Sequence, residues 1–156
     1  SEEFMMPDTG LDEGIEMKAE VFLPEDYTPA ENEPFMNELQ LEYFRRKLVR
    51  WRLELLEGSR EAIESLQDGT RAIPDVADRA SEETDRALEL RTRDRQRKLV
   101  AKIDAALRRI EDGEYGYCEV TGEPISLKRL DARPIATMTL EAQERHERRE
   151  KVHRDD

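Results

Sequence analysis

Apolar residues recur at alternating intervals of three and four positions along the segment that follows residue 37. This stripe consists of Leu41, Phe44, Leu48, Trp51 and Leu55, and Ala62 and Leu66 continue it. A narrow stripe with a period of about 3.5 residues is typical of a helix that packs against one partner helix. Asn37 is a suitable N-cap for this helix, and Gly69 favours its end.

A second apolar stripe follows Ile73-Pro74 and stops near Gly113. Its members are Ala80, Ala87, Leu88, Leu99, Ile103, Leu107 and Ile110. Two helices joined by a short connection must run antiparallel. At 1.5 Å per residue, helices of roughly 30 to 38 residues would form a rod on the order of 50 Å long. The pattern therefore predicts a mainly α fold built on a long antiparallel two-helix coiled coil.

Beyond Gly113 the pattern changes to that of a small globular head. A turn over 114–122 precedes an apolar cluster of Ile125, Leu127, Leu130, Ile135, Met138 and Leu140, and a helix with charges on nearly all sides ends the chain. We therefore divide the chain into an acidic N-terminal segment (1–33), a coiled-coil hairpin with its tip near 68–80 (34–110), the head (111–140) and a charged C-terminal helix (141–156).

The composition favours a protein partner over a nucleic acid. Charged residues make up 41% of the chain and hydrophobic residues 37%, which suits long helices with one thin apolar stripe. The net charge of −12 disfavours binding to a phosphate backbone. No apolar run approaches the roughly 20 residues of a membrane span, and a single cysteine excludes an intramolecular disulfide. We expect a cytoplasmic protein that binds no membrane.

The head has the spacing of a zinc module but lacks its ligands. A four-thiolate zinc site needs two Cys-x-x-Cys pairs. Here Thr121 follows Cys118 by three residues, and Thr139 and Ala142 form the second pair of positions. We therefore expect a zinc-finger-like head without metal, held by its apolar residues and by the last helix packing back on it. No catalytic constellation is present, so we expect no enzyme.

Three polar groups allow a structural and a functional interpretation. At the hairpin tip, Asp75 and Asp78 either cap the second helix or act at the far end of the rod. Five of the eight residues 91–98 are basic, and Arg91 and Arg95 take positions where the stripe predicts core contacts. This stretch is either a solvated face or a docking surface for an acidic partner.

The third group combines Lys128, Arg129 and Arg133 of the head with Lys102 near the base of the second helix. These cations are either scattered and solvated or form a small anion pocket where the rod meets the head.

Several stretches together resemble the TraR/DksA family of bacterial RNA polymerase-binding transcription factors. They are Asp75-x-x-Asp78-x-Ala80, the run LELRTRDRQRKL over 88–99, EYGYC over 114–118 and RLDARP over 129–134, and the similarity covers about residues 33–140. It implies a monomer that binds no DNA, inserts its coiled coil into the secondary channel of RNA polymerase and alters open-complex stability together with ppGpp. Stringent control of ribosomal RNA promoters is the implied context.

The resemblance also implies roles for particular residues. The tip residues Asp75, Asp78 and Ala80 would act in the polymerase channel. Docking on polymerase would involve Arg91, Arg95 and Arg129, and ppGpp would contact Leu99, Lys102 and Arg133.

The chain departs from the family pattern at two places. Cys118, Thr121, Thr139 and Ala142 occupy the four zinc-ligand positions, so no zinc is expected, and Gln143 replaces a basic residue of the ppGpp site. Two alternative functions stay open on the residues alone: a structural coiled-coil adaptor, and a channel factor of the transcript-cleavage type.

Overall fold

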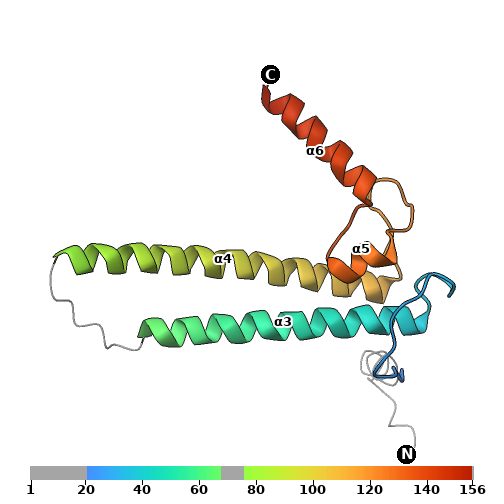
Figure 1. The fold of residues 1–156 in the computed structure, drawn as a ribbon, viewed down its shortest axis with the longest axis horizontal. Helices are drawn as coiled ribbons and strands as arrows, with labels where there is room; N and C mark the ends of the chain where they lie inside the picture. Colours follow the sequence, from blue (N-terminus) through green and yellow to red (C-terminus); the bar gives the residue numbers. More distant parts are fainter. Residues whose placement is uncertain (1–20, 68–75, 156) are drawn as a thin grey trace, which may run out of the picture.

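The structure, a computed structural model, describes residues 21–67 and 76–155. Within these residues the helices are α3 (Glu38–Gln67), α4 (Val76–Asp112), α5 (Leu127–Ala132) and α6 (Leu140–Asp155). Helices α3 and α4 lie side by side as an antiparallel rod, the head with α5 sits at the base of the rod, and α6 points away from both (Figure 1). The predicted fold class is confirmed. None of the described helices is long and apolar enough to cross a membrane.

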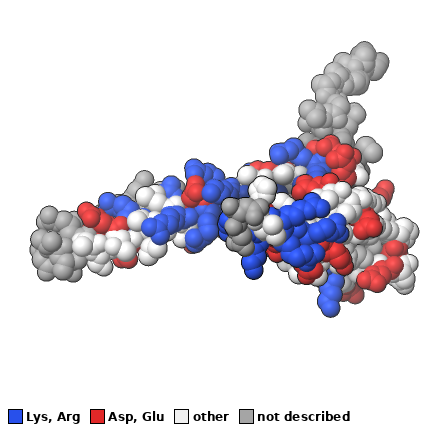
Figure 2. Space-filling model, turned by 90° about the horizontal axis from the view of Figure 1, so that it is seen from above, with Lys and Arg blue, Asp and Glu red and all other residues white. Residues whose placement is uncertain are grey.

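Basic side chains are concentrated on part of this surface. Figure 2 shows Lys and Arg gathered over the middle of the rod and over the head on the face it presents, with acidic side chains more scattered. The chain as a whole carries a net charge of −12, so these basic areas are local departures from the overall balance.

Helix α3 begins at the predicted cap. The Asn37 side-chain oxygen accepts a hydrogen bond of 2.8 Å from the backbone N–H of Gln40, and the Asn37 carbonyl accepts one of 2.9 Å from Leu41. The Gln40 side chain in turn accepts a 2.7 Å hydrogen bond from the N–H of Met36. The bond from the Gln40 N–H satisfies a backbone donor that the helix itself leaves unpaired, and the bond from Leu41 is the first of the regular helical bonds.

Helix α4 ends where the sequence predicts. Gly113 has a φ of +77°, a conformation that glycine adopts without steric cost. The N–H groups of Glu114 and Tyr115 then bond to the carbonyl of Arg109, at 2.8 and 3.1 Å, and close the last turn. The predicted breaker Gly69 and the predicted cap Asp75 lie outside the described residues.

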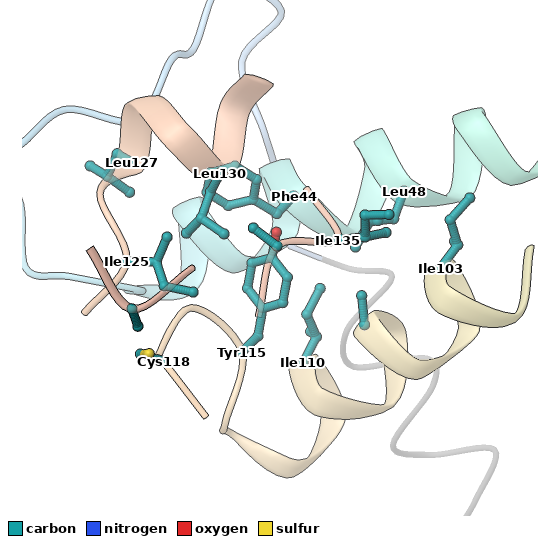
Figure 3. Packing of buried hydrophobic residues seen from close by; sticks show 13 residues of the cluster. Phe44, Leu48, Ile103, Ile110, Tyr115, Cys118, Ile125, Leu127, Leu130 and Ile135 are labelled. Atoms are coloured by element: carbon teal, nitrogen blue, oxygen red, sulfur yellow. The ribbon is translucent and has the colours of Figure 1, made fainter. Parts of the chain in front are cut away.

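The apolar stripes form a core at the base of the rod. Phe44 and Leu48 of α3 and Ile103 of α4 are fully buried, and Ile110 is 7% exposed (Figure 3). Leu41, Trp51, Leu55, Leu99 and Leu107 are half-buried against this core. The predicted stripes are therefore correct for the half of the rod that lies next to the head.

The predicted stripe of α4 is wrong farther from the head. Leu88 is 51% exposed and Ala80 is exposed, so neither is a core residue. At 100° per residue, Gln96 lies within about 20° of the direction of Ile103, whereas Arg91 lies about 120° from it. Gln96 is accordingly half-buried, and Arg91, predicted at a core position, is exposed.

Arg95, also predicted at a core position, is exposed, and Arg93 is half-buried instead. Polar side chains thus occupy the positions of α4 that face α3 in this part of the rod. The side chains of Ala62 and Leu66, which were predicted to continue the stripe of α3, lie outside what the structure describes.

The head has an apolar interior that continues the core of the rod. Ile125 and Leu130 are fully buried, and the phenol of Tyr115, 1% exposed, donates a 2.8 Å hydrogen bond to the carbonyl of Pro134. Leu127 and Ile135 are also buried, as predicted. Leu140 is 52% exposed, so its predicted place in the cluster is wrong.

The last helix does not pack back on the head. Ala142 is buried and Gln143 half-buried, but residues 144–154 are all exposed. Because α6 carries charged side chains on nearly every side after its first turn, it has no apolar face to bury, and the expectation that it supports the head is wrong.

A polar triad fastens the head to the rod. The Asp131 carboxylate of α5 accepts hydrogen bonds of 2.6 Å from the Tyr43 hydroxyl and from the Lys47 ammonium, both on α3. Burial raises the pKa of Asp131, but the bonds from Lys47 and Tyr43 outweigh burial and hold that pKa below its ordinary value. The ring of Tyr43 also packs edge-on against Phe44, with centroids 5.1 Å apart, so the triad borders the core.

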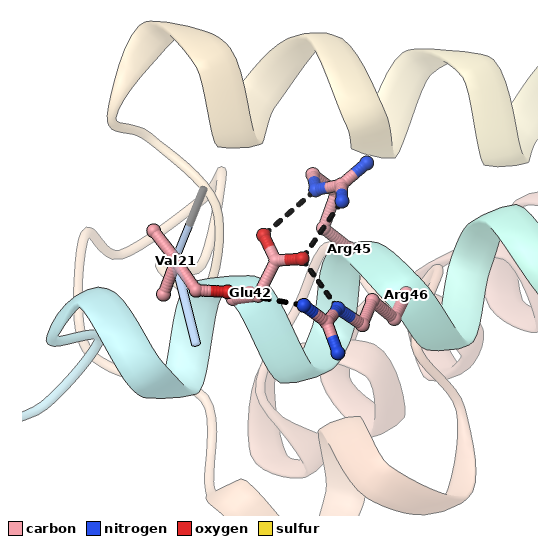
Figure 4. A network of polar contacts seen from close by, with 4 residues as sticks. All are labelled: Val21, Glu42, Arg45 and Arg46. Atoms are coloured by element: carbon pink, nitrogen blue, oxygen red, sulfur yellow. Dashed lines mark hydrogen bonds and ion pairs between the residues drawn. The ribbon is translucent and has the colours of Figure 1, made fainter. Parts of the chain in front are cut away.

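A buried carboxylate organises the start of the described chain. Glu42, 3% exposed, accepts hydrogen bonds of 2.8 and 2.7 Å from Arg45 and one of 2.5 Å from Arg46, while Arg46 donates a further bond of 3.0 Å to the carbonyl of Val21 (Figure 4). Burial raises the pKa of Glu42, yet its two arginine partners lower it further than burial raises it. The cluster therefore fixes Val21 beside α3.

Residues 22–37 lie at the base of the rod (Figure 1). The Glu33 carboxylate accepts bonds from the Tyr27 hydroxyl, at 2.7 Å, and from the Gln40 amide, at 3.1 Å. The Phe35 ring packs edge-on against Tyr117 of the head, with centroids 5.3 Å apart. Residues 22–33, which belong to the predicted acidic N-terminal segment, thus link the rod and the head together with residues 34–37.

We predict that Asp131→Asn lowers the free energy of unfolding by about 1 kcal/mol at pH 7. Bonds to a charged group contribute about 1.5–3 kcal/mol when buried, and solvent screening reduces this figure at a half-exposed carboxyl. The depressed pKa means that the stabilisation is present above the ordinary aspartate pKa of about 3.9 and is lost as pH falls below it, through the lower pKa of the folded state.

Urea unfolding of both proteins between pH 3 and 7 measures the difference. Asp85→Asn, an exposed change on α4, is the control and should have little effect. Equal stability of the wild type and Asp131→Asn at pH 7 would contradict this role of the triad.

Candidate functional site

The structure brings the four zinc-ligand positions of the head together around two turns. The first turn is closed by a bond of 2.8 Å from the N–H of Gly122 to the carbonyl of Cys118. The Thr139 hydroxyl, from the second turn, lies 4.0 Å from the Cys118 sulfur. Both Cys118 and Ala142 are 3% exposed, and Cys118 lies at the edge of the core (Figure 3).

Each of the other three positions has a structural contact that needs no metal. The Thr139 hydroxyl accepts a 3.2 Å bond from the N–H of Ala142 and so caps α6. The Ala142 methyl is part of the buried cluster. The Thr121 hydroxyl accepts a 3.2 Å bond from the N–H of Glu123 and supports the first turn.

These residues do not fit a zinc ion. Structural zinc takes four ligands from cysteine, histidine or carboxylate side chains. Cys118 supplies one thiolate, whereas Thr121 and Thr139 supply neutral hydroxyls and Ala142 supplies no donor. Throughout 21–67 and 76–155, no three or more His, Cys, Asp or Glu side chains form a group able to hold a metal.

The thiol of Cys118 lies among hydrogen-bond donors. Burial raises its pKa, but the hydroxyl of Thr121 and the backbone N–H groups of Thr121, Thr139 and Val120 more than offset burial and lower that pKa to about 7. Several donors thus converge on the sulfur from both turns and stabilise its thiolate form.

The two turns are also joined directly to each other. The N–H of Glu119 donates a 2.8 Å bond to the carbonyl of Thr137, and the Thr137 hydroxyl donates a 3.1 Å bond to the Glu119 carboxylate. A metal would hold the turns together through its ligands, and here a backbone bond and a side-chain bond connect them.

The arginines of α4 border a groove between the two helices of the rod. It has a volume of about 760 Å³. Its lining consists of Leu55, Leu56 and Ser59 of α3 and Leu90, Arg91, Arg93, Asp94, Arg95, Gln96, Arg97 and Val100 of α4. Arg97 pairs with Asp94, and Lys98 lies 3.4 Å from the same carboxylate. Both predicted docking residues of the rod, Arg91 and Arg95, are therefore exposed at the groove.

The predicted docking residue of the head has a structural contact as well. The Arg129 guanidinium donates a 2.9 Å bond to the carbonyl of Met138 and so ties α5 to the chain that leads into α6. The rest of its side chain lines a hollow of about 530 Å³ together with Lys128 and Arg133.

The residues assigned to ppGpp fall in two places. Arg133 is exposed at the hollow of the head, and no residue of α4 lines that hollow. Lys102 is exposed on α4 and Leu99 is half-buried there. Gln143 uses its amide to donate a 2.9 Å bond to Glu147 within α6. Arg133 therefore lines the same hollow as Lys128 and Arg129, whereas Lys102 lies on the rod outside that hollow.

Only part of the hairpin tip is described. Ala80 is exposed on the first turns of α4. Asp78 lies in the same helix, but its side chain is outside the described residues, as is the whole of Asp75. The roles assigned to the two aspartates therefore stay predictions.

Residues that position the site were missed by sequence reasoning. Tyr43 and Lys47 are four apart and so share one face of α3, but nothing local points to Asp131, which lies 84 residues beyond Lys47. The Glu42 cluster was missed for a different reason, because a carboxylate with arginines three and four residues later is ordinarily a solvated pair.

The chain thus combines a two-helix rod that carries a basic groove with a zinc-finger-like head that lacks the zinc ligands. Comparison with known proteins identifies the family that has this architecture. The family described as DnaK suppressor protein DksA, N-terminal domain, matches residues 40–110, and the prokaryotic dksA/traR C4-type zinc finger matches residues 113–148. The chain therefore belongs to the TraR/DksA family. The zinc-finger family is of the C4 type, with four cysteine ligands, whereas this chain has Cys118 as its single cysteine.

Individual relatives cover most of the chain. RNA polymerase-binding transcription factor DksA of Caulobacter vibrioides is 70% identical over 131 residues, which are 84% of this chain and 92% of that protein. Its Escherichia coli K12 counterpart is 42% identical over 81% of this chain and 84% of that protein. The structure of transcription factor DksA2 from Pseudomonas aeruginosa aligns with a TM-score of 0.70 at 42% identity, covering 87% of this chain and 97% of that one.

We predict that the purified protein holds no stoichiometric zinc, and that Thr121→Cys/Thr139→Cys/Ala142→Cys binds about one zinc per chain. The two turns already face each other, so supplying three thiolates completes a four-thiolate set with an apparent binding free energy of about 10–16 kcal/mol.

Elemental analysis of both proteins, with thermal unfolding before and after chelation, measures this. The chelator should lower the melting temperature of the triple variant alone. One zinc per wild-type chain would show the ligand assignment to be wrong, and a zinc-free triple variant would show that the turns are not spaced for a metal.

Proposed function

We propose that this protein is a transcription regulator that binds RNA polymerase directly, as a monomer and without binding DNA. Its rod enters the secondary channel, its tip acts there through Asp75, Asp78 and Ala80, and it alters open-complex stability together with ppGpp at promoters such as those of ribosomal RNA. In this role it is a non-enzymatic partner of the polymerase.

The observation that carries this proposal is the shape and surface of the rod. Helices of 30 and 37 residues extend from the head as a pair, so the tip can enter a channel too narrow for a globular domain. Arg91 and Arg95 are exposed partway along the rod, where they can contact acidic residues at a channel rim. The relatives named as RNA polymerase-binding transcription factors align with 84% and 81% of this chain.

The charge of the chain supports a protein partner. A surface that binds DNA gains affinity by replacing counterions with Lys and Arg, and a protein of net charge −12 is repelled by DNA outside its basic groove. The groove is bordered by leucines as well as by arginines, a combination that suits a protein surface.

We predict that Asp78→Asn retains binding to core RNA polymerase but loses regulation of a ribosomal RNA promoter. The change removes a charge at the tip and leaves the arginines of the groove in place. Pull-down of core polymerase and in vitro transcription with and without ppGpp are the two measurements, with Glu83→Gln, an exposed change farther along α4, as the control.

If Asp78→Asn only lowers stability, by the roughly 0.5–2 kcal/mol of a lost helix cap, and regulation survives, the capping interpretation is correct. Failure of the wild-type protein to retain polymerase would overturn the proposed function itself.

Arg95→Ala is expected to weaken polymerase binding about fivefold at low salt, and the loss should shrink as salt screens the contact. A binding titration at several salt concentrations measures both effects. Arg149→Ala, an exposed arginine on α6, provides a matched loss of charge outside the groove. An equal loss of affinity in the two variants would place docking elsewhere.

We predict that ppGpp acts at a higher concentration than it would with a cation at position 143. A charge-assisted bond contributes about 1.5–3 kcal/mol, and the Gln143 amide cannot supply one. Gln143→Lys should therefore lower the ppGpp midpoint by roughly tenfold in the transcription assay, and Lys102→Ala or Arg133→Ala should abolish the synergy.

Glu144→Gln is the control for a charge change in the same turn. An unchanged midpoint in Gln143→Lys would show that the missing cation is irrelevant. A wild-type response in Lys102→Ala would show that this assignment of the ppGpp site is wrong.

A further inference from the structure

The groove between α3 and α4 combines features that call for a complementary ligand. Leu55, Leu56, Leu90 and Val100 give it an apolar floor, and Leu56 and Leu90 stay 42% and 51% exposed. Arg91 and Arg93 at its border have no carboxylate partner among the described residues. A fitting ligand is therefore an acidic chain with a few apolar side chains.

The first twenty residues of this chain have that composition. They contain seven acids against the single Lys18, a net charge of −6. Leu11 and Ile15 are four apart, and acids flank them: Asp12, Glu13, Glu16 and Glu20. The spacing of Leu11 and Ile15 equals about one helical turn in the sequence, and the acids lie on both sides of this apolar pair.

The place where this segment joins the described chain supports the pairing. The Arg46 guanidinium holds the carbonyl of Val21 at 3.0 Å, and Arg46 and Arg45 share the Glu42 carboxylate (Figure 4). At 100° per residue, Leu56 projects within about 20° of the direction of Arg45 on α3. Arg46, which binds Val21, projects about 80° from Leu56, so the chain enters the described structure on a face of α3 next to the one that borders the groove.

The distance from Val21, where the segment joins the described chain, to the groove is short compared with the length of residues 1–20. Ten residues of α3 separate Arg46 from Leu56, which corresponds to about 15 Å along the helix axis. Five extended residues span about this length, at roughly 3.3 Å each. Twenty residues can therefore reach the groove and leave more than half of their length to lie in it.

We propose that residues 1–20 dock in the groove between α3 and α4 and compete there with RNA polymerase for Arg91, Arg93 and Arg95. The docked segment neutralises the arginines and covers the exposed leucines when polymerase is absent. Polymerase must displace it to reach the same arginines. The competition rests on the proposed function, whereas the docking itself does not.

Photo-cross-linking of the full chain tests the docking without polymerase. A benzophenone amino acid at the Leu90 position should form cross-links with residues 1–20, found by mass spectrometry, and the same amino acid at the Arg149 position on α6 is the control. The yield should fall at least fivefold in Asp12→Asn/Glu13→Gln/Glu16→Gln/Glu20→Gln and also at 0.5 M NaCl, roughly three times the physiological ionic strength.

Mixing isotopically labelled and unlabelled protein separates links within one chain from links between chains. A yield at Leu90 no higher than at Arg149 would overturn the docking, as would a yield that the four neutral substitutions leave unchanged. Links found only between chains would show that the groove receives a second copy instead.

Binding of core polymerase tests the competition. The fourfold neutral variant should bind about tenfold more tightly than the wild type at low salt, and the two should become equal at high salt. Equal affinity at low salt would overturn the competition. If neither protein binds polymerase, the proposed function fails, and the cross-linking result still decides the docking.

Discussion

Burial of apolar surface is concentrated where the base of the rod meets the head, and the remaining features depend on that contact. Phe44 of α3, Ile103 of α4 and Leu130 of α5 are each fully buried there, although they come from distant parts of the sequence. Farther along the rod, polar residues face α3, so that part has little core of its own. The direction of the rod is consequently set at its base, where Asp131 bonds to Tyr43 and Lys47.

In the head, several hydrogen bonds connect the two turns that a zinc ion would connect in a four-thiolate zinc finger. A structural zinc fixes two turns through four bonds, and without it a small module ordinarily loses its fold. Here Thr139 caps α6 and approaches Cys118, while Glu119 and Thr137 join the turns. Each neutral hydrogen bond contributes only about 1 kcal/mol to stability. These bonds can hold the two turns because the apolar core of the rod continues beneath the head and supplies most of the stabilisation.

What the sequence predicts correctly follows from local spacing. The N-cap at Asn37 and the end of α4 near Gly113 depend on residue types a few positions apart, and the apolar stripe is correct for the half of the rod next to the head. The stripe fails at Leu88 because hydrophobicity indicates a preference for burial, whereas the Leu88 side chain is 51% exposed and no residue of the described parts of the chain covers it fully. Contacts such as that of Asp131 with Tyr43, 88 residues away, depend on the folded geometry, and no local pattern encodes them.

The balance of charge connects the fold to recognition. An acidic chain with local basic areas discriminates among partners by repulsion as well as by attraction, because its net charge of −12 repels polyanions such as DNA. Arg91 and Arg93 stay available since the polar seam of the rod offers them no carboxylate among the described residues. An apolar seam would have stiffened the rod but would have replaced Gln96 and Arg93, half-buried polar residues of α4 in this part of the rod. Arg93 therefore has two effects, because it weakens the packing of this region and also borders the groove that can recognise an acidic protein surface.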